Sequence, residues 1–183
     1  MAFDPKQYGQ DVERILSLGQ DGNRLIPLHY TPYDTAEARS LLKTYEPADL
    51  FPDLEEPEAP LAGLWLYFSC FDEAHKLAEM CETEEGDLWH ALIHSHEGDS
   101  GNAAYWFRRA GPHPIFTQIA RATVKIIRRH PTVEFRTGRW DPFAFLAFCD
   151  RARKQPGSIH ERVAMEIQRA EWQILFDYTA RPQ

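Results

Sequence analysis

Cysteine is scarce in this chain of 183 residues, and the three that occur, Cys70, Cys81 and Cys149, are widely spaced. Their number is odd and no C-x-x-C pair is present. This pattern argues against a disulfide framework and against a structural zinc site built on thiolates, and it favours a reducing compartment. Cys70 and Cys149 lie in apolar runs, so we expect them to be buried and unreactive.

Long apolar runs are also missing. The most apolar stretch, residues 61–71, is far too short to cross a bilayer as a helix. Residues 1–7 show no basic start followed by an apolar run, so a signal peptide is not expected. Together with the cysteine pattern, this predicts a cytoplasmic protein.

Positive charge is in the minority, because the chain carries a formal net charge of −8. An acidic surface repels phosphate backbones and anionic lipids, so we expect neither nucleic acid nor a membrane as a partner. One basic stretch stands apart, and we interpret it as a solvated helix face. Its residues are Arg121, Lys125, Arg128, Arg129, Arg136 and Arg139.

Several motifs of well-known enzyme classes are absent from the sequence. It contains no glycine-rich phosphate loop, nucleophile elbow or dinucleotide fingerprint. The chain does contain 43% apolar and 13% aromatic residues, in a length that suits one domain with its own core.

Helix signals recur along the chain. Asp4 and Asp141 are each followed by proline, which is typical of an N-cap with proline in the first turn. Ser158 and Glu161 form a capping-box pattern, and a first helix is predicted from Pro5 to about Leu18. These signals predict an all-α fold of about eight helices, arranged as a helical bundle or as stacked helical hairpins.

An acidic, proline-rich segment near residues 46–60 divides the pattern. It holds four prolines and six acidic residues without a basic one, and proline at that density interrupts helices. We predict one helical domain over 1–183, with N-terminal helices in 1–45, a linker or arm in 46–60 and the main body in 61–183. Phe51 and Leu54 favour partial docking of the arm.

The segment 89–114 holds four of the eight histidines and two of the five tryptophans. His90, His94 and Glu97 are spaced i, i+4 and i+7, which places them on one helix face. A turn at Gly98 should return His113 to the neighbourhood of His90. These four residues are therefore candidate ligands of a divalent metal ion. Zinc-protease chemistry is excluded, because Ala91 stands where that motif needs its glutamate base.

The same residues also fit a site without metal. Histidines beside a close helix pair can be core residues that are satisfied by hydrogen bonds. A groove for a small molecule or a protein partner would then be lined by side chains of the same segment. Its candidate residues are His90, His94, Tyr105, Trp106, Arg109 and His113. The aromatic content is compatible with a homodimer, but no pattern fixes an interface.

Two resemblances attach to this segment. Gly98, Ala103, Phe107 and Ala110 are similar to the turn and second helix of a tetratricopeptide-type hairpin, although one unit alone is present. A longer pattern resembles the signature of a family of uncharacterised bacterial and fungal proteins. It runs from Trp89-His90-Ala91 through Glu97-Gly98-Asp99 and Tyr105-Trp106-Phe107 to His113-Pro114, and it includes Trp140-Asp141-Pro142-Phe143. That resemblance spans roughly residues 65–150. It implies a helical fold and brings no activity with it.

Two functional hypotheses follow. The first is a non-catalytic scaffold that binds an unidentified ligand or protein in the His, Trp and Arg groove. The second is a metal-dependent, hydrolase-like enzyme that uses His90, His94, Glu97 and His113.

Overall fold

The computed structural model describes residues 3–28, 35–135 and 138–182, so Arg136 of the basic stretch lies outside the described residues. Over these ranges the chain forms ten α-helices and a short 3-10 helix, with no strand. The predicted all-α fold is confirmed. The 3-10 helix is Pro5–Tyr8, and the α-helices are α1 (Gln10–Ser17), α2 (Ala36–Leu42), α3 (Pro47–Leu50), α4 (Glu58–Tyr67), α5 (Phe71–Ala78), α6 (Glu84–Glu97), α7 (Ser100–Ala110), α8 (Ile115–Arg129), α9 (Pro142–Arg153) and α10 (Ile159–Thr179).

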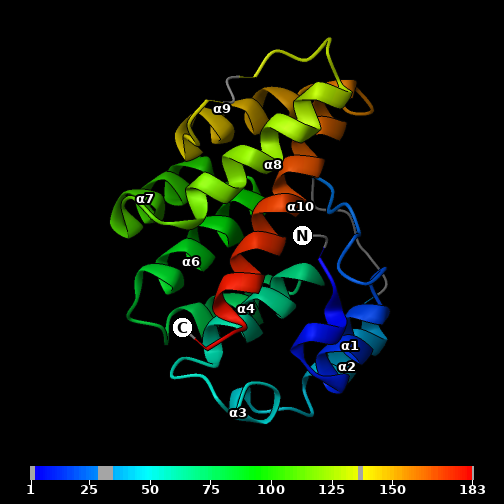
Figure 1. Cartoon of the computed structure of the whole chain (residues 1–183), viewed down its shortest axis with the longest axis vertical. Coiled ribbons are helices and arrows are strands. Elements are labelled where there is room, and N and C mark those ends of the chain that lie inside the picture. Colours follow the sequence, from blue (N-terminus) through cyan, green and yellow to red (C-terminus); the bar gives the residue numbers. More distant parts are fainter. Residues whose placement is uncertain (1–2, 29–34, 136–137, 183) are drawn as a thin grey trace.

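The 21-residue helix α10 lies in the middle of the molecule (Figure 1). Helices α6 and α7 lie on one side of it and the N-terminal helices α1 and α2 on the other, while α8 crosses beside its first half (Figure 1). Its residues pack against α4, α6, α8 and α9. None of the helices in the described part of the chain is long and apolar enough to span a membrane.

The buried apolar side chains form one continuous cluster that reaches from Tyr8 to Phe176. Its centre is aromatic, with Trp172 against Tyr67 and Phe176 at ring-centroid separations of 4.6 and 5.0 Å. The indole Nε1 of Trp172 donates to the carbonyl of Gly63, which lies in α4, at 2.8 Å. The buried polar edge of this large aromatic side chain is thereby satisfied.

Segments from the two ends of the described chain also meet. The Tyr8 hydroxyl donates to Oδ1 of Asp177 at 2.6 Å, and the Tyr8 ring packs edge-on against Phe176. These contacts fix the 3-10 helix on the last turns of α10.

Several predicted helix ends are confirmed by their capping hydrogen bonds. Asp141 accepts from the backbone N–H groups of Phe143 and Ala144, and Ser158 accepts from that of Glu161. Gly98 ends α6 with φ of +85°, in the left-handed region where a residue without Cβ is favoured.

The first helix differs from the prediction. A single helix from Pro5 to about Leu18 was expected, but Gly9 has φ of +96° and separates the 3-10 helix from α1. A helix cannot continue through that backbone conformation, and glycine adopts it without the penalty that a Cβ would bring.

The acidic segment 46–60 is more ordered than a tether. It contains α3 and the first turn of α4. Pro47 does not interrupt α3, because it occupies the first position of this helix, where the missing N–H of proline costs nothing. Phe51 is buried in the core, and the partly buried Leu54 packs against the core. The segment therefore lies as an arm on the body, in line with the predicted docking of these two residues.

Candidate functional site

Three side chains that can ligate a metal come together from α5 and α6. His75 lies in α5, whereas His94 and Glu97 lie in the last turn of α6. The Nε2 atom of His75 is 3.0 Å from Oε2 of Glu97, and Nδ1 of His94 is 3.4 Å from the same oxygen. One ligand atom from each residue lies within 4.8 Å of the other two. We call these three residues the histidine cluster.

The local fold explains why they meet. The connection from Glu79 to Thr83 is short, so α6 folds back along α5 as a helical hairpin. The Thr83 hydroxyl accepts from the N–H of Gly86 and fixes the start of α6. His94 and Glu97 are spaced i, i+3, so they share the face of α6 that meets His75.

The spacing of the cluster suits a coordinated ion. Metal bonds to imidazole nitrogen and carboxylate oxygen of about 2.0–2.2 Å place neighbouring ligand atoms about 3 Å apart. The side chains of His75, His94 and Glu97 are 23%, 18% and 31% exposed. The cluster therefore lies at the edge of the solvent-accessible surface, although Nδ1 of His94 itself is buried.

His94 is in the chemical form that a metal requires. Burial, followed by the nearby His75, lowers the pKa of His94, so the imidazole is neutral at pH 7. Among the described residues its buried Nδ1 has no hydrogen-bond partner, although Glu97 is within ion-pair distance. A neutral imidazole with an unused ring nitrogen is ready to ligate.

His90 lies next to the cluster but on its buried side. Its ring stacks on Trp106 with centroids 4.0 Å apart and planes 8° apart, and lies 5.6 Å from the His75 ring. Burial, followed by His75 and His94, lowers the pKa of His90 to about 4. This predicted ligand is a neutral neighbour of the three residues rather than one of them.

The other predicted binding residues of α7 continue from His90 along the surface. Arg109 lies over the Trp106 ring at 5.0 Å, and its Nε donates to Oδ2 of Asp87 at 3.0 Å. The exposed Tyr105 meets Trp106 edge-on at 5.3 Å. The structure thus connects His94, His90, Trp106, Tyr105 and Arg109 by neighbouring contacts.

His113 makes a different set of contacts. Its Nε2 lies 3.3 Å from Oε1 of Glu85, in the first turn of α6, and its ring meets Tyr178 at 5.0 Å. The backbone N–H of Ile115 lies 3.4 Å from Nδ1 of His113. The physical reason is the length of α7, since eleven helical residues cover about 16 Å and carry the chain back along α6 to its start.

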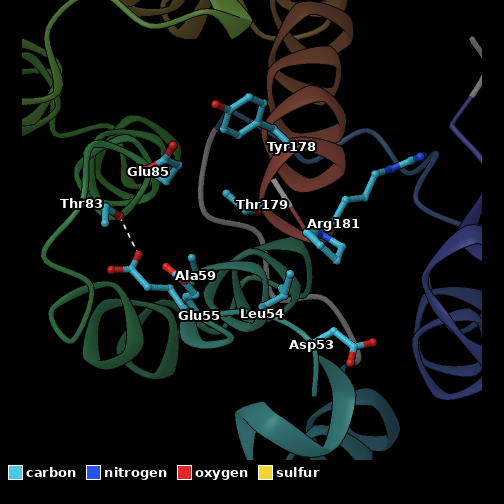
Figure 2. Close-up of a pocket in the computed structure, with 11 residues that line it drawn as sticks. Asp53, Leu54, Glu55, Ala59, Thr83, Glu85, Tyr178, Thr179 and Arg181 are labelled. Carbon is cyan, nitrogen blue, oxygen red and sulfur yellow. Dashed lines mark hydrogen bonds between the residues drawn. The ribbon is translucent and has the colours of Figure 1, made fainter.

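Glu85 also lines a cavity of about 380 Å³ between α6, the end of α10 and the segment before α4 (Figure 2). Four carboxylates, from Asp53, Glu55, Glu56 and Glu85, contribute to its wall. Thr83 donates to Glu56 at 2.6 Å across this wall. None of the six predicted binding residues is among the described residues that line it.

The three cysteines do not provide a nucleophile. All are free and buried. Burial raises the pKa of Cys81 to about 12, and it also raises the pKa values of Cys70 and Cys149. Their thiols remain protonated at neutral pH and are unreactive.

His75 is the cluster residue that sequence reasoning missed. It is the only histidine of its predicted helix, and carboxylates at helical spacing from it, Asp72 and Glu79, are common on solvated helix faces. The available signal was the short connection between the two predicted helices, which implies a hairpin and places α5 against the His94 face of α6.

Comparison with protein-family models, with curated proteins and with solved structures gave no match.

Proposed function

We propose that this protein binds a divalent transition-metal ion through His75, His94 and Glu97 and uses it in a hydrolytic reaction. The observation that carries this proposal is the convergence of three ligand atoms from two helices within 4.8 Å. Two imidazoles and one carboxylate form a ligand set that zinc and neighbouring first-row metals accept.

The position of the cluster also favours a cation. Glu97 and His94 lie in the last turn of α6, where the helix dipole carries about half a negative charge. A carboxylate there is unfavourable by itself, and a bound dication offsets both the dipole and the Glu97 charge. A metal ion thus accounts for an acidic residue at this helix end.

Three protein ligands leave at least one coordination position for water. A zinc-bound water has a pKa near 7, so metal activation supplies hydroxide at neutral pH. This arrangement supports hydrolase-like chemistry over a purely passive scaffold. The scaffold hypothesis needs a groove, and its six predicted residues line neither the cavity beside Glu85 nor a second cavity between α8 and α10.

The free and buried cysteines are in keeping with the cytoplasmic location inferred from the sequence.

The first test is metal binding by chelator-treated, untagged protein, measured by calorimetry with Zn²⁺ and by the visible spectrum with Co²⁺. We expect one ion per chain. His75→Ala and His94→Ala should each weaken binding by about a hundredfold or more, because loss of supporting partners alone costs 10–100-fold. Glu97→Gln keeps the shape and removes the charge, so it should weaken binding as well.

His160→Ala is the matched control, because this histidine of α10 contacts Phe148 and is not a member of the histidine cluster. It should retain the affinity of the parent. Equal affinity in His75→Ala and the parent, or no binding at millimolar Zn²⁺, would contradict the proposal.

The second test is hydrolysis of a panel of activated esters and phosphoesters by the zinc-loaded protein. We expect turnover that is lost in His94→Ala and retained in His160→Ala. Stoichiometric zinc without turnover on any member would remove hydrolysis from the proposal and leave metal binding.

A further inference from the structure

We propose a second site, at the junction of α8 and α10, that binds the phosphate group of a small molecule. A cavity of about 370 Å³ at this junction is lined by Leu25, Arg129, His130, Arg162, Glu166 and Arg169. Its volume falls in the range of small-molecule sites. The site is separate from the histidine cluster and does not depend on the proposed metal chemistry.

The charges around this cavity do not balance. The cavity is lined by three guanidinium groups but by only one carboxylate, that of Glu166. The C-terminal end of α8 adds about half a negative charge through its helix dipole. About one and a half positive charges are therefore left among the lining groups, in a chain whose net charge is −8. An anionic ligand would compensate this local excess.

Glu166 holds two of the arginines in place. Its buried carboxylate accepts from Nη2 of Arg129 at 3.0 Å and from Nε of Arg162 at 3.1 Å. His130 lies 3.3 Å from the same group. Residues 162, 166 and 169 share one face of α10, because they are spaced i, i+4 and i+7. The guanidinium groups are thus anchored before a ligand arrives, which lowers the entropy lost on binding.

Donors remain after this anchoring. The side chains of Arg129 and Arg162 are about 60% exposed, at 60% and 61%. Arg169 is anchored by Nη1, which donates to the carbonyl of Asn23 at 2.9 Å. Each guanidinium has five N–H donors, so several stay available within the described part of the chain. Planar guanidinium forks match phosphate oxygens in pairs, which lysine cannot do.

The shape favours a small molecule over a polyanion. Nucleic acids and anionic membranes need an extended basic surface, and the rest of this chain is acidic. The three arginines instead line one cavity together with the buried Glu166. The ligand class is therefore a phosphate monoester or inorganic phosphate.

The test uses inorganic phosphate on metal-free protein at constant ionic strength, so that phosphate cannot bind through a metal ion. Binding is followed by calorimetry and by the arginine Nε–Hε signals in ¹⁵N NMR spectra. We expect saturable binding at one site. Arg129→Gln and Arg162→Gln should each weaken it by about tenfold or more, as expected for the loss of a charged hydrogen bond.

Arg128→Gln is the matched control, since it removes the same charge from the adjacent exposed position of α8, outside the cavity. Its affinity should stay within about twofold of the parent, as the change is limited to screened surface charge. Arg162→Lys keeps the charge but loses the fork, and we expect an intermediate affinity. Circular dichroism checks that each variant is folded.

Three results would overturn the proposal. The first is no phosphate binding at 20 mM, roughly the weakest affinity relevant to a cell. The second is equal weakening by Arg128→Gln and Arg129→Gln, which would show a general charge effect. The third is binding of duplex DNA or phosphatidylglycerol vesicles without binding of inorganic phosphate. Loss of zinc binding in the histidine variants would leave this site unaffected.

Discussion

Glu171 carries its carboxyl group inside the core, where burial raises its pKa well above the usual range. The folded state therefore holds a proton that the unfolded chain releases above a pKa of about 4.3. His96 has the opposite effect, because burial lowers its pKa to about 3. The pH dependence of the free energy of unfolding of the parent therefore combines opposing contributions from the two residues. A variant of one residue is needed to separate them.

We expect Glu171→Gln to change the pH dependence of stability in a defined direction. The proton on Glu171 contributes its full stabilisation at a pH below about 4.3, where the unfolded chain is protonated as well. As the pH rises from there toward the folded-state pKa of Glu171, the free energy of unfolding falls by up to about 1.4 kcal/mol per pH unit. Relative to the parent, the free energy of unfolding of the variant should therefore increase by about 1 kcal/mol or more from pH 5 to pH 7. Urea denaturation at both pH values measures this difference.

Glu79→Gln serves as the control, because Glu79 is exposed at the end of α5. Its stability profile should run parallel to that of the parent. If the Glu171→Gln profile is parallel as well, the buried carboxyl group does not hold an extra proton in the folded state.

At the scale of the elements, one close helix contact involves Gly63 of α4 and Trp89 of α6. A Cβ at Gly63 would lie 2.5 Å from Cη2 of Trp89, whose ring is fully buried. Gly63→Ala gains about 1 kcal/mol of helix propensity but overpacks a rigid ring, which costs about 1–3 kcal/mol. We expect a net loss of up to about 2 kcal/mol in the free energy of unfolding.

Gly101→Ala is the matched control for this substitution. Gly101 also lies in a helix, but the nearest atom to its added Cβ is Oδ1 of Asp99, at an ordinary 3.5 Å. This variant should be as stable as the parent or more stable, by up to about 1 kcal/mol. Equal effects of the two substitutions in urea denaturation would argue against a tight α4–α6 contact.

The helices themselves could be predicted because their signals are local. Asp141 and Ser158 cap their helices through backbone groups two or three residues away, so the sequence alone carries that information. The break at Gly9 was not predictable in the same way, since glycine permits a positive φ without requiring it. Local patterns therefore predicted the fold class better than the exact bounds.

The site was harder to predict, because it depends on which helices meet. The i, i+3 pair His94 and Glu97 was recognised from spacing within one helix. His75 was missed and His113 was included. The lengths of the helices and of their connections decide which residues of neighbouring helices lie side by side, and spacing within one helix does not contain this information. Periodicity identifies the faces of helices but does not identify the partners of those faces.

At the scale of the whole molecule, one core joins residues of nearly every helix. Helix α10 lies between the N-terminal helices and the α6–α7 pair (Figure 1). We therefore expect a single cooperative unfolding transition, because one continuous core cannot be lost in part without exposing the rest. Urea curves followed by far-ultraviolet circular dichroism and by tryptophan fluorescence should coincide.

Separate midpoints in the two curves would contradict this prediction. The five tryptophans all lie at position 65 or later. A circular dichroism change that precedes the fluorescence change would therefore show that part of the helical structure is lost before the core around the tryptophans opens.

The contact between Tyr8 and Asp177 joins residues that are 169 positions apart. Most helical proteins fold fast because their contacts are close in sequence, whereas distant contacts require a large loop to close first. We therefore expect the 3-10 helix at Pro5–Tyr8 to dock only after the last turns of α10 have formed. Folding order would then differ from chain order, because an early segment of the sequence waits for a late one.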